Sequence, residues 1–361
     1  MSISARFEID YARFLAPDGT VEQPLPAFAR DRATPERLYR AMVLTRTFDA
    51  RAVALQRTGR LGTYASSLGQ EAVPVGTADA MLPGDVLLPS FREHGAQYLR
   101  GVTLLEILRF WGGDERGSCF AAQPRDFPVA ITVGAHATHA VGVAHAMRHR
   151  GEANAAVCVF GDGATSKGDV YEAMNIAGAW RSPVVFVVNN NQWAISVSRA
   201  AQSAAATLAQ KAIAAGIGGE QVDGNDVIAV RHAVGEALAR ARAGGGAHLV
   251  ECLSYRLCDH TTADDASRYR DDAEVSARWK EDPLARLRAW LAATWGWSRE
   301  DEEALQHACS REVEEAANAW LASAPQPPRA MFDHLYARLP AALQAQLATL
   351  ERHAGGTGAH G

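Results

Sequence analysis

The sequence lacks the features that mark membrane, secreted and nucleic-acid-binding proteins. No apolar stretch reaches the roughly 18 residues that a membrane span requires. There is no long basic block and the net charge is −5, which argues against nucleic acid as a partner. The N-terminus carries Glu8, Asp10 and Asp18, and it resembles neither a signal peptide nor an Arg-rich transit peptide. We therefore expect a cytoplasmic, bacterial protein.

Cysteine is scarce as well. The five cysteines show no close pairing along the chain, and Cys158 and Cys252 lie in apolar, strand-like runs. Cysteines in such runs are most simply small buried apolar side chains. We expect neither a disulfide nor a cysteine metal site.

The chain does contain enough apolar sequence for a large core. Of its 361 residues, 48% are hydrophobic and 21% are charged. This balance is typical of a folded globular chain, and the length suits one large domain with appended helices.

The most informative segment runs from Phe160 to Ser196. An apolar run over 155–160 ends in Gly161-Asp162-Gly163, and a second run over 184–188 ends in Asn189-Asn190-Asn191. Apolar side chains recur at helical spacing between them, which predicts a strand, a crossover helix and a second, parallel strand. Both polar clusters then lie at carboxyl ends of parallel strands, where open α/β sheets bind their ligands.

These clusters offer ligands for a metal-bound diphosphate. Asp162 supplies a carboxylate and Asn191 an amide oxygen, and hard oxygen ligands of this kind suit Mg²⁺. Gly161 and Gly163 let the backbone approach a diphosphate, whose charge is favoured by the N–H groups of the following helix start. The alternative is an ordinary β-α-β unit with a glycine turn and an Asn-rich loop. The position of each cluster directly after an apolar run favours the ligand site.

The segment resembles the thiamine diphosphate motif, in which Gly-Asp-Gly is followed further along by Asn-Asn. Its surroundings, from about Leu38 to Leu291, resemble the alpha subunit of the decarboxylating component of 2-oxo acid dehydrogenase complexes. Further segments match that family in the same order: Gly-Gln-Glu-Ala at 69–72, Phe-Arg-Glu at 91–93, His-Ala-Val-Gly at 139–142, Val-Asp-Gly-Asn-Asp at 222–226, and the loop of 260–270.

The resemblance assigns roles to residues of this chain. Arg92 matches a diphosphate-binding arginine, since a guanidinium grips phosphate oxygens in bidentate fashion; the alternative is a surface arginine. His260 matches a catalytic histidine that faces the cofactor, where it can bind phosphate and shuttle a proton. The implied metal ligands are Asp162, Asn191 and the backbone carbonyl of Trp193. The implied cofactor contacts are Arg92, Ile131, Val133, Asp162, Gly163, Ala164, Asn191 and His260.

Some positions depart from the family or have open roles. Phe91 replaces the usual Tyr and is expected only to pack, and His136 replaces the usual Gln. Thr261 stands where eukaryotic relatives carry a regulatory phosphoserine, and we expect it only to shape its loop. The charges of that loop, which are Asp264, Asp265 and Arg270, either order it through ion pairs or are solvated.

The resemblance also implies the reaction. It implies oxidative decarboxylation of a 2-oxo acid with thiamine diphosphate and Mg²⁺, and transfer of the acyl group to a lipoyl group on a separate acyltransferase. The family's glutamate that activates the aminopyrimidine belongs to the beta subunit. We therefore expect an alpha chain that is inactive alone and works as a heterotetramer of two alpha and two beta chains.

Pyruvate is the favoured substrate, because residues 64–72 and 110–115 resemble alpha subunits assigned to pyruvate. The Asp264-Asp265 pair also occurs in branched-chain enzymes, so 2-oxoisovalerate is the alternative, and acetoin is a third. A homodimeric thiamine enzyme of the transketolase or decarboxylase type is a rival, although such chains carry both cofactor domains and are longer. A non-catalytic assembly subunit is disfavoured by the presence of the residues named above.

The implied fold is an α/β, parallel-sheet thiamine diphosphate-binding fold with helices on both faces and a helical C-terminal extension. The expected parts are an irregular arm over 1–33, the α/β domain over 34–280, the extension over 281–354 and a disordered tail over 355–361. We predict a helix from a capping Thr34 and a helix over 331–350. The loop over 112–128 is long enough to suggest a function.

Overall fold

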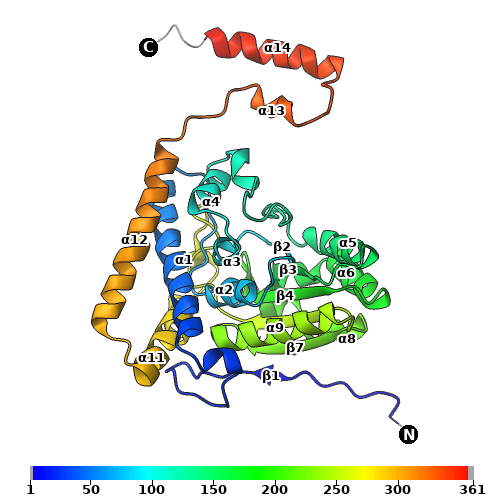
Figure 1. Cartoon of the computed structure of the whole chain (residues 1–361), viewed down its shortest axis with the longest axis vertical. Helices are drawn as coiled ribbons and strands as arrows, with labels where there is room; N and C mark the ends of the chain where they lie inside the picture. Colours follow the sequence, from blue (N-terminus) through cyan, green and yellow to red (C-terminus); the bar gives the residue numbers. More distant parts are fainter. Residues whose placement is uncertain (1–2, 357–361) are drawn as a thin grey trace. The chain divides into compact units, whose positions relative to one another are not determined.

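The computed structural model describes residues 3–356. Its centre is a six-stranded parallel sheet with the strand order β1-β7-β8-β4-β3-β2 (Figure 1). The strands are β1 (Tyr11–Ala12), β2 (Val86–Leu88), β3 (Ala156–Gly161), β4 (Val184–Asn190), β7 (Gly218–Asp223) and β8 (His248–Leu253). A short antiparallel hairpin, β5 (Trp193–Ala194) and β6 (Val197–Ser198), follows β4. The predicted fold class is confirmed.

Helices make up most of the remaining structure. Those before β4 are α1 (Ala33–Arg57), α2 (Ala72–Asp79), α3 (His94–Leu99), α4 (Leu104–Trp111), α5 (His136–His149) and α6 (Gly168–Ala179). Those after β4 are α7 (Arg199–Gln202), α8 (Gln210–Ala214), α9 (Val227–Arg242), α10 (Asp272–Arg278), α11 (Pro283–Trp295), α12 (Arg299–Leu321), α13 (Ala330–Asp333) and α14 (Ala341–Gly356). The short 3-10 helices are η1 (Ala27–Ala29), η2 (Glu115–Ser118), η3 (Asp162–Ser166), η4 (Ala266–Arg268) and η5 (Trp279–Glu281).

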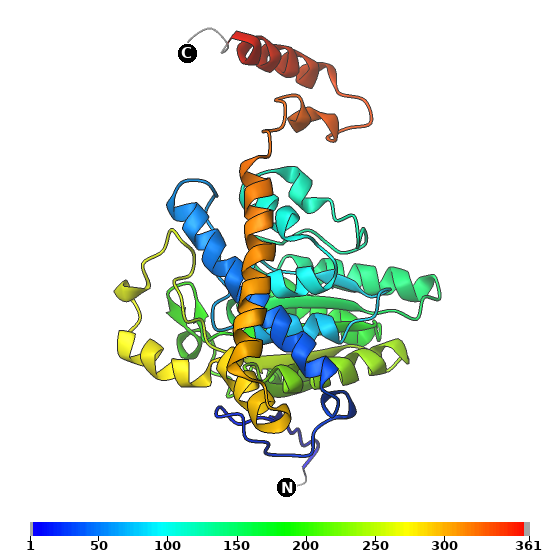
Figure 2. The same ribbon diagram turned by 60° about the vertical axis from the view of Figure 1, so that its left-hand side comes forward.

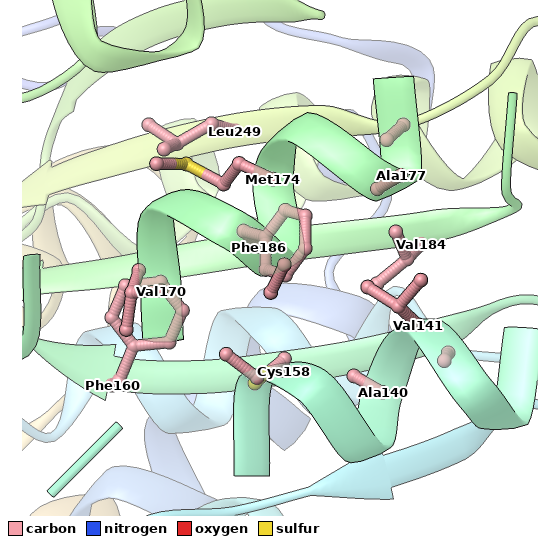
Figure 3. Packing of buried hydrophobic residues seen from close by; sticks show 14 of the residues in the cluster. Ala140, Val141, Cys158, Phe160, Val170, Met174, Ala177, Val184, Phe186 and Leu249 are labelled. Atoms are coloured by element: carbon pink, nitrogen blue, oxygen red, sulfur yellow. The ribbon is translucent and has the colours of Figure 1, made fainter. Parts of the chain in front are cut away.

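The sheet is buried on both faces, which explains why β3 and β4 are continuous apolar runs. On one face, Cys158, Phe160 and Phe186 pack against Val170 and Met174 of α6, with α5 and α8 alongside (Figure 3). On the other face, α9 contacts β4, β7 and β8, and α2 packs against α9. The strands β3 and β4 are therefore packed between two helical layers.

Three local expectations are corrected. The arm over 1–33 is not wholly irregular, because β1 pairs in parallel with β7 at the sheet edge. The first helix begins at Ala33, and the Asp31 side chain accepts the Thr34 N–H at 2.9 Å, so Thr34 is not its cap. The helix expected over 331–350 is two helices. Pro340 directly precedes α14, where its missing N–H leaves no hydrogen bond unmade.

The chain divides into two compact units, residues 1–318 and 319–361. In the first unit, the part of α12 up to Asn318 crosses α1 (Figure 2), and the Tyr39 hydroxyl donates to Glu302 at 2.9 Å. The second unit contains α13 and α14. The domain boundaries expected at 33/34 and 280/281 stay predictions. Of the expected tail, 355–356 belong to α14, and 357–361 lie outside the described residues.

The structure also shows the state of the cysteines and the character of the helices. All five cysteines are free, and Cys158 and Cys252 are buried in strands β3 and β8 as predicted. Within residues 3–356, none of the helices combines the length and apolarity needed to cross a membrane.

Candidate cofactor site

A cavity of about 680 Å³ lies at the carboxyl ends of β3 and β4. The register of the two strands explains its position, since Gly161 lies opposite Asn189 and each chain continues directly into a polar cluster. All the side chains or backbone segments assigned above to the cofactor or metal line this one cavity: Arg92, Ile131, Val133, Asp162, Gly163, Ala164, Asn191, Trp193 and His260. Residues up to 168 positions apart therefore meet in one place.

Asp162 is a buried carboxylate at the floor of the site. It is 3% exposed, and its carboxylate accepts a hydrogen bond from the Gln202 amide at 2.9 Å. Burial raises its pKa to about 6, because the charged form has lost its water. A cation beside the carboxylate would favour the charged form, so the electrostatics of this position suit a metal ion.

Asn191 and Trp193 line the same cavity, and each carries a further oxygen. The Asn191 Oδ1 atom accepts the backbone N–H of Trp193 at 3.1 Å, and its Nδ2 atom donates to Gln70 Oε1 at 2.7 Å. The Trp193 carbonyl lies 3.5 Å from a guanidinium nitrogen of Arg256. Among residues 3–356 there is no cluster of three or more His, Cys, Asp or Glu side chains suited to a metal. A site here would instead combine one carboxylate with amide, carbonyl and ligand oxygens, as Mg²⁺ accepts.

Gly163 packs closely against the β5–β6 hairpin, which lines this part of the cavity. A Cβ atom at Gly163 would lie 2.6 Å from the Cβ of Ala194 in β5. The neighbouring Ala164 is fully buried and packs into the core. The small residues after Asp162 therefore let backbone, rather than side chains, line the cavity.

Arg92 and His260 form a second cluster on the cavity wall. Arg92 is 5% exposed, which excludes the alternative of a surface arginine. Its guanidinium donates to the Ser66 carbonyl and to the His260 carbonyl, the latter at 2.6 Å, and it lies 3.0 Å from His260 Nδ1. Phe91 packs as predicted, with its ring edge-on to His260 at 5.9 Å between centroids.

The protonation of His260 follows from these neighbours. Arg92 and Arg256 approach its Nδ1 atom at 3.0 and 3.3 Å, and a guanidinium can only donate hydrogen bonds. Nδ1 is therefore an acceptor and Nε2 carries the proton. Burial, Arg92 and Arg256 together lower the pKa of His260 to about 4, so the ring is neutral at pH 7.

Hydrogen bonds organise the loop that carries His260. Asp264 accepts the backbone N–H of His260 at 2.8 Å and the hydroxyl of Tyr269. Arg270 donates to the backbone carbonyls of Arg256 and Cys258. The ion pairing considered for this loop is found for Asp265, which pairs with Arg268 at 3.2 Å. Asp264 and Arg270 instead bond to a hydroxyl and to backbone groups, which need no opposite charge.

Three of the remaining residues named from the sequence line the cavity, and His136 does not. Ile131 and Val133 are 55% and 44% exposed. His136 is buried, with Nε2 2.7 Å from the Val159 carbonyl, and it is not part of the cavity lining. The replacement of Gln by His is thus accommodated behind β3. Thr261 lines the cavity next to His260.

Comparison with known proteins agrees with this geometry. Residues 39–328 match the family described as "Dehydrogenase E1 component". The chain belongs to this family. It is 39% identical over 344 residues, 94% of this chain and 93% of the relative, to the 3-methyl-2-oxobutanoate dehydrogenase subunit alpha of Mycobacterium tuberculosis. It is 38% identical over 327 residues, 90% of this chain and 87% of the relative, to the pyruvate dehydrogenase E1 component subunit alpha of Bacillus subtilis. The resemblance drawn from the motifs is confirmed.

Several residues of this E1 chain lie at the site although the sequence analysis gave their side chains no role. Gln202 contacts Asp162, Gln70 contacts Asn191, and Arg256 contacts His260. Glu93 also lines the cavity, and burial raises its pKa to about 7. Gln70 and Glu93 fall inside segments that match the family, so their positions were visible there. Gln202 follows no pattern that a single sequence reveals.

Proposed function

We propose that this chain is the alpha subunit of a thiamine diphosphate-dependent 2-oxo acid dehydrogenase and that it binds Mg²⁺ with the cofactor. One observation carries the proposal: a single cavity joins the buried Asp162 and Asn191 to the Arg92–His260 pair. The first pair suits a metal ion and the second suits a diphosphate. Four other cavities in the described part of the chain are lined by none of these four residues.

Each residue of the cavity has a proposed role. Asp162, Asn191 and the Trp193 carbonyl would hold Mg²⁺, and Arg92 would bind the diphosphate beside the backbone of Gly163 and Ala164. When bound, thiamine diphosphate stabilises the carbanion left by loss of CO₂. His260 presents a neutral ring with its proton on Nε2 and can donate that proton in a hydrogen bond to developing charge. The backbone at Ile131 and Val133 would contact the aminopyrimidine.

A separate beta subunit is the proposed partner. Large apolar side chains at the cavity are exposed, with Ile131 and Ile195 each at 55% and Val197 at 45%. Burying such side chains against a second chain would exclude water from the reaction. The assembly is proposed to contain two alpha and two beta chains, to pass its acyl group to a lipoyl-acyltransferase core, and to work in the cytoplasm.

Pyruvate is the proposed substrate. This choice rests on the similarity of residues 64–72 and 110–115 to alpha subunits assigned to pyruvate. Over the whole chain, however, relatives named for pyruvate and for 3-methyl-2-oxobutanoate are almost equally similar to this protein. A difference of one or two methylenes in the pocket changes discrimination by about 1–3 kcal/mol. The second candidate is therefore the branched-chain acid, 2-oxoisovalerate, and the third is acetoin.

The test is turnover by the co-expressed alpha and beta chains with each of the three substrates, thiamine diphosphate and Mg²⁺. We expect the pair to decarboxylate pyruvate and to show its highest kcat/KM with pyruvate, and the alpha chain alone to turn over none of the three substrates. Turnover by a preparation free of beta chain would favour the homodimeric rival. A pair that binds the cofactor but turns over none of the substrates would favour the assembly-subunit rival.

A further inference from the structure

The amide of Asn191 is held by a second buried amide. Asn191 is 6% exposed and Gln70 is 0% exposed, and Asn191 Nδ2 donates to Gln70 Oε1 at 2.7 Å. The two residues are 121 positions apart, so the fold and not local sequence brings them together. Both line the cavity.

The orientation of both amides follows from one backbone group. The Trp193 N–H can only donate, and it lies 3.1 Å from the Asn191 side chain, which therefore presents its oxygen there. Nδ2 must then face Gln70. Because Nδ2 of Asn191 is a donor, Gln70 turns its acceptor, Oε1, toward it. If the Gln70 amide were flipped, two NH₂ groups would face each other. If the Asn191 amide were flipped, its NH₂ group would face the Trp193 N–H and its oxygen would face Gln70 Oε1.

Gln70 keeps this orientation although its amide nitrogen makes no hydrogen bond to the described residues. Its Nε2 atom is buried and has no hydrogen-bond partner among the residues that the structure describes. An unpaired buried donor is unfavourable, so the acceptor contact with Asn191 outweighs that cost. The backbone anchors Gln70 independently, because its N–H donates to the Ser67 carbonyl at 2.9 Å and Gly69 before it has a φ of 85°.

We propose that Gln70 is a positioning residue for the metal site: it fixes the amide of Asn191 so that Oδ1 is available to the ion. The inference rests on the proposed function, in which Asn191 is a metal ligand. Without the Gln70 acceptor, the Asn191 amide would lose one of the two contacts that fix its rotation. The consequence should be a loss of Mg²⁺ affinity rather than a loss of folding.

The experiment measures Mg²⁺ affinity by calorimetry in the alpha–beta complex at saturating thiamine diphosphate. Gln70→Met has a similar length but no acceptor, and Mg²⁺ affinity should fall by about tenfold, the usual cost of losing a residue that orients a metal ligand. Gln70→Glu keeps an acceptor facing Nδ2 and should lose less Mg²⁺ affinity than Gln70→Met. Wild-type affinity in Gln70→Met, or equal losses in both variants, would overturn the proposal.

A double-mutant cycle keeps the test decisive if Gln70→Met also perturbs folding. In Asn191→Asp, either carboxylate oxygen can bind the ion, so there is no amide to orient. Gln70→Met should then cost Mg²⁺ affinity in the parent and little in the Asn191→Asp background. Equal losses in both backgrounds would show a purely structural role. If the parent complex itself binds no Mg²⁺ with the cofactor, the proposed function fails, and that result is distinct from either outcome for Gln70.

Discussion

The guanidinium of Arg92 lies 3.0 Å from Nδ1 of His260 and donates to the carbonyl of the same residue at 2.6 Å. The residue expected to bind the diphosphate therefore also positions the residue expected to act at the reacting centre. Because Arg92 is cationic, it also disfavours a second positive charge on His260. This contact fixes the position of the histidine and, together with burial and Arg256, its tautomer and its charge.

The first prediction concerns His260. His260→Ala should lower kcat by much more than it weakens cofactor binding, since the proposed role of the ring is at the reacting centre. Steady-state kinetics and calorimetry of the assembled complex measure the two quantities, and the exposed His307→Ala serves as control. Matching losses of turnover and of affinity would show that His260 only binds the cofactor.

The second prediction concerns Gly163. A methyl group there would meet Ala194 Cβ at 2.6 Å, so Gly163→Ala should displace the hairpin and destabilise the fold by about 1–3 kcal/mol. Gly168→Ala is a matched control, because its added Cβ has no heavy atom within 4 Å. Thermal unfolding checks stability, and calorimetry should show weaker cofactor binding for Gly163→Ala alone. If Gly163→Ala and Gly168→Ala had the same Tm, close packing between Gly163 and Ala194 would be refuted.

The third prediction concerns the loop over 258–272. Its order rests on polar contacts, so we expect it to be mobile without cofactor and to be ordered by it, the contacts offsetting about 1–2 kcal/mol of entropy per residue fixed. Limited proteolysis should cut after Arg268, whose side chain is 81% exposed, rather than after the buried Arg270. Thiamine diphosphate with Mg²⁺ should slow the cut. Equal rates with and without cofactor would contradict a cofactor-ordered loop.

The fourth prediction concerns pH and Glu93. Burial raises its pKa from 4.5 to about 7, so the folded chain binds this proton more tightly than the unfolded chain. Its contribution to stability is complete below about pH 4.5 and is lost as the pH rises through about 7. Glu93→Gln stays neutral and can still accept from Ser90. Its Tm relative to wild type should therefore rise between pH 5 and 8, by the equivalent of about 3 kcal/mol at most. Parallel Tm curves across that range would refute the raised pKa.

The sequence predicted the centre of the molecule because the signals there are local. Buried parallel strands read as continuous apolar runs, and Asp162 and Asn191 follow β3 and β4 at the ends of such runs. Gln202 and Gln70 escaped prediction because their contacts with these residues span 40 and 121 positions and depend on how loops pack. Pro340 marks the break before α14, and the single helix predicted over 331–350 was wrong because it ran through this proline.

The central claim is that Asp162 anchors a metal-bound thiamine diphosphate. Calorimetric titration of the alpha–beta complex with thiamine diphosphate and Mg²⁺ tests it most directly, with Asp162→Ala compared against Asp169→Ala, an exposed aspartate on α6. We expect Asp162→Ala to abolish Mg²⁺-dependent binding, because it removes the single carboxylate proposed to hold the metal, and Asp169→Ala to bind as wild type does. Cofactor affinity of Asp162→Ala within about twofold of wild type, a difference of only about 0.4 kcal/mol, would contradict the account.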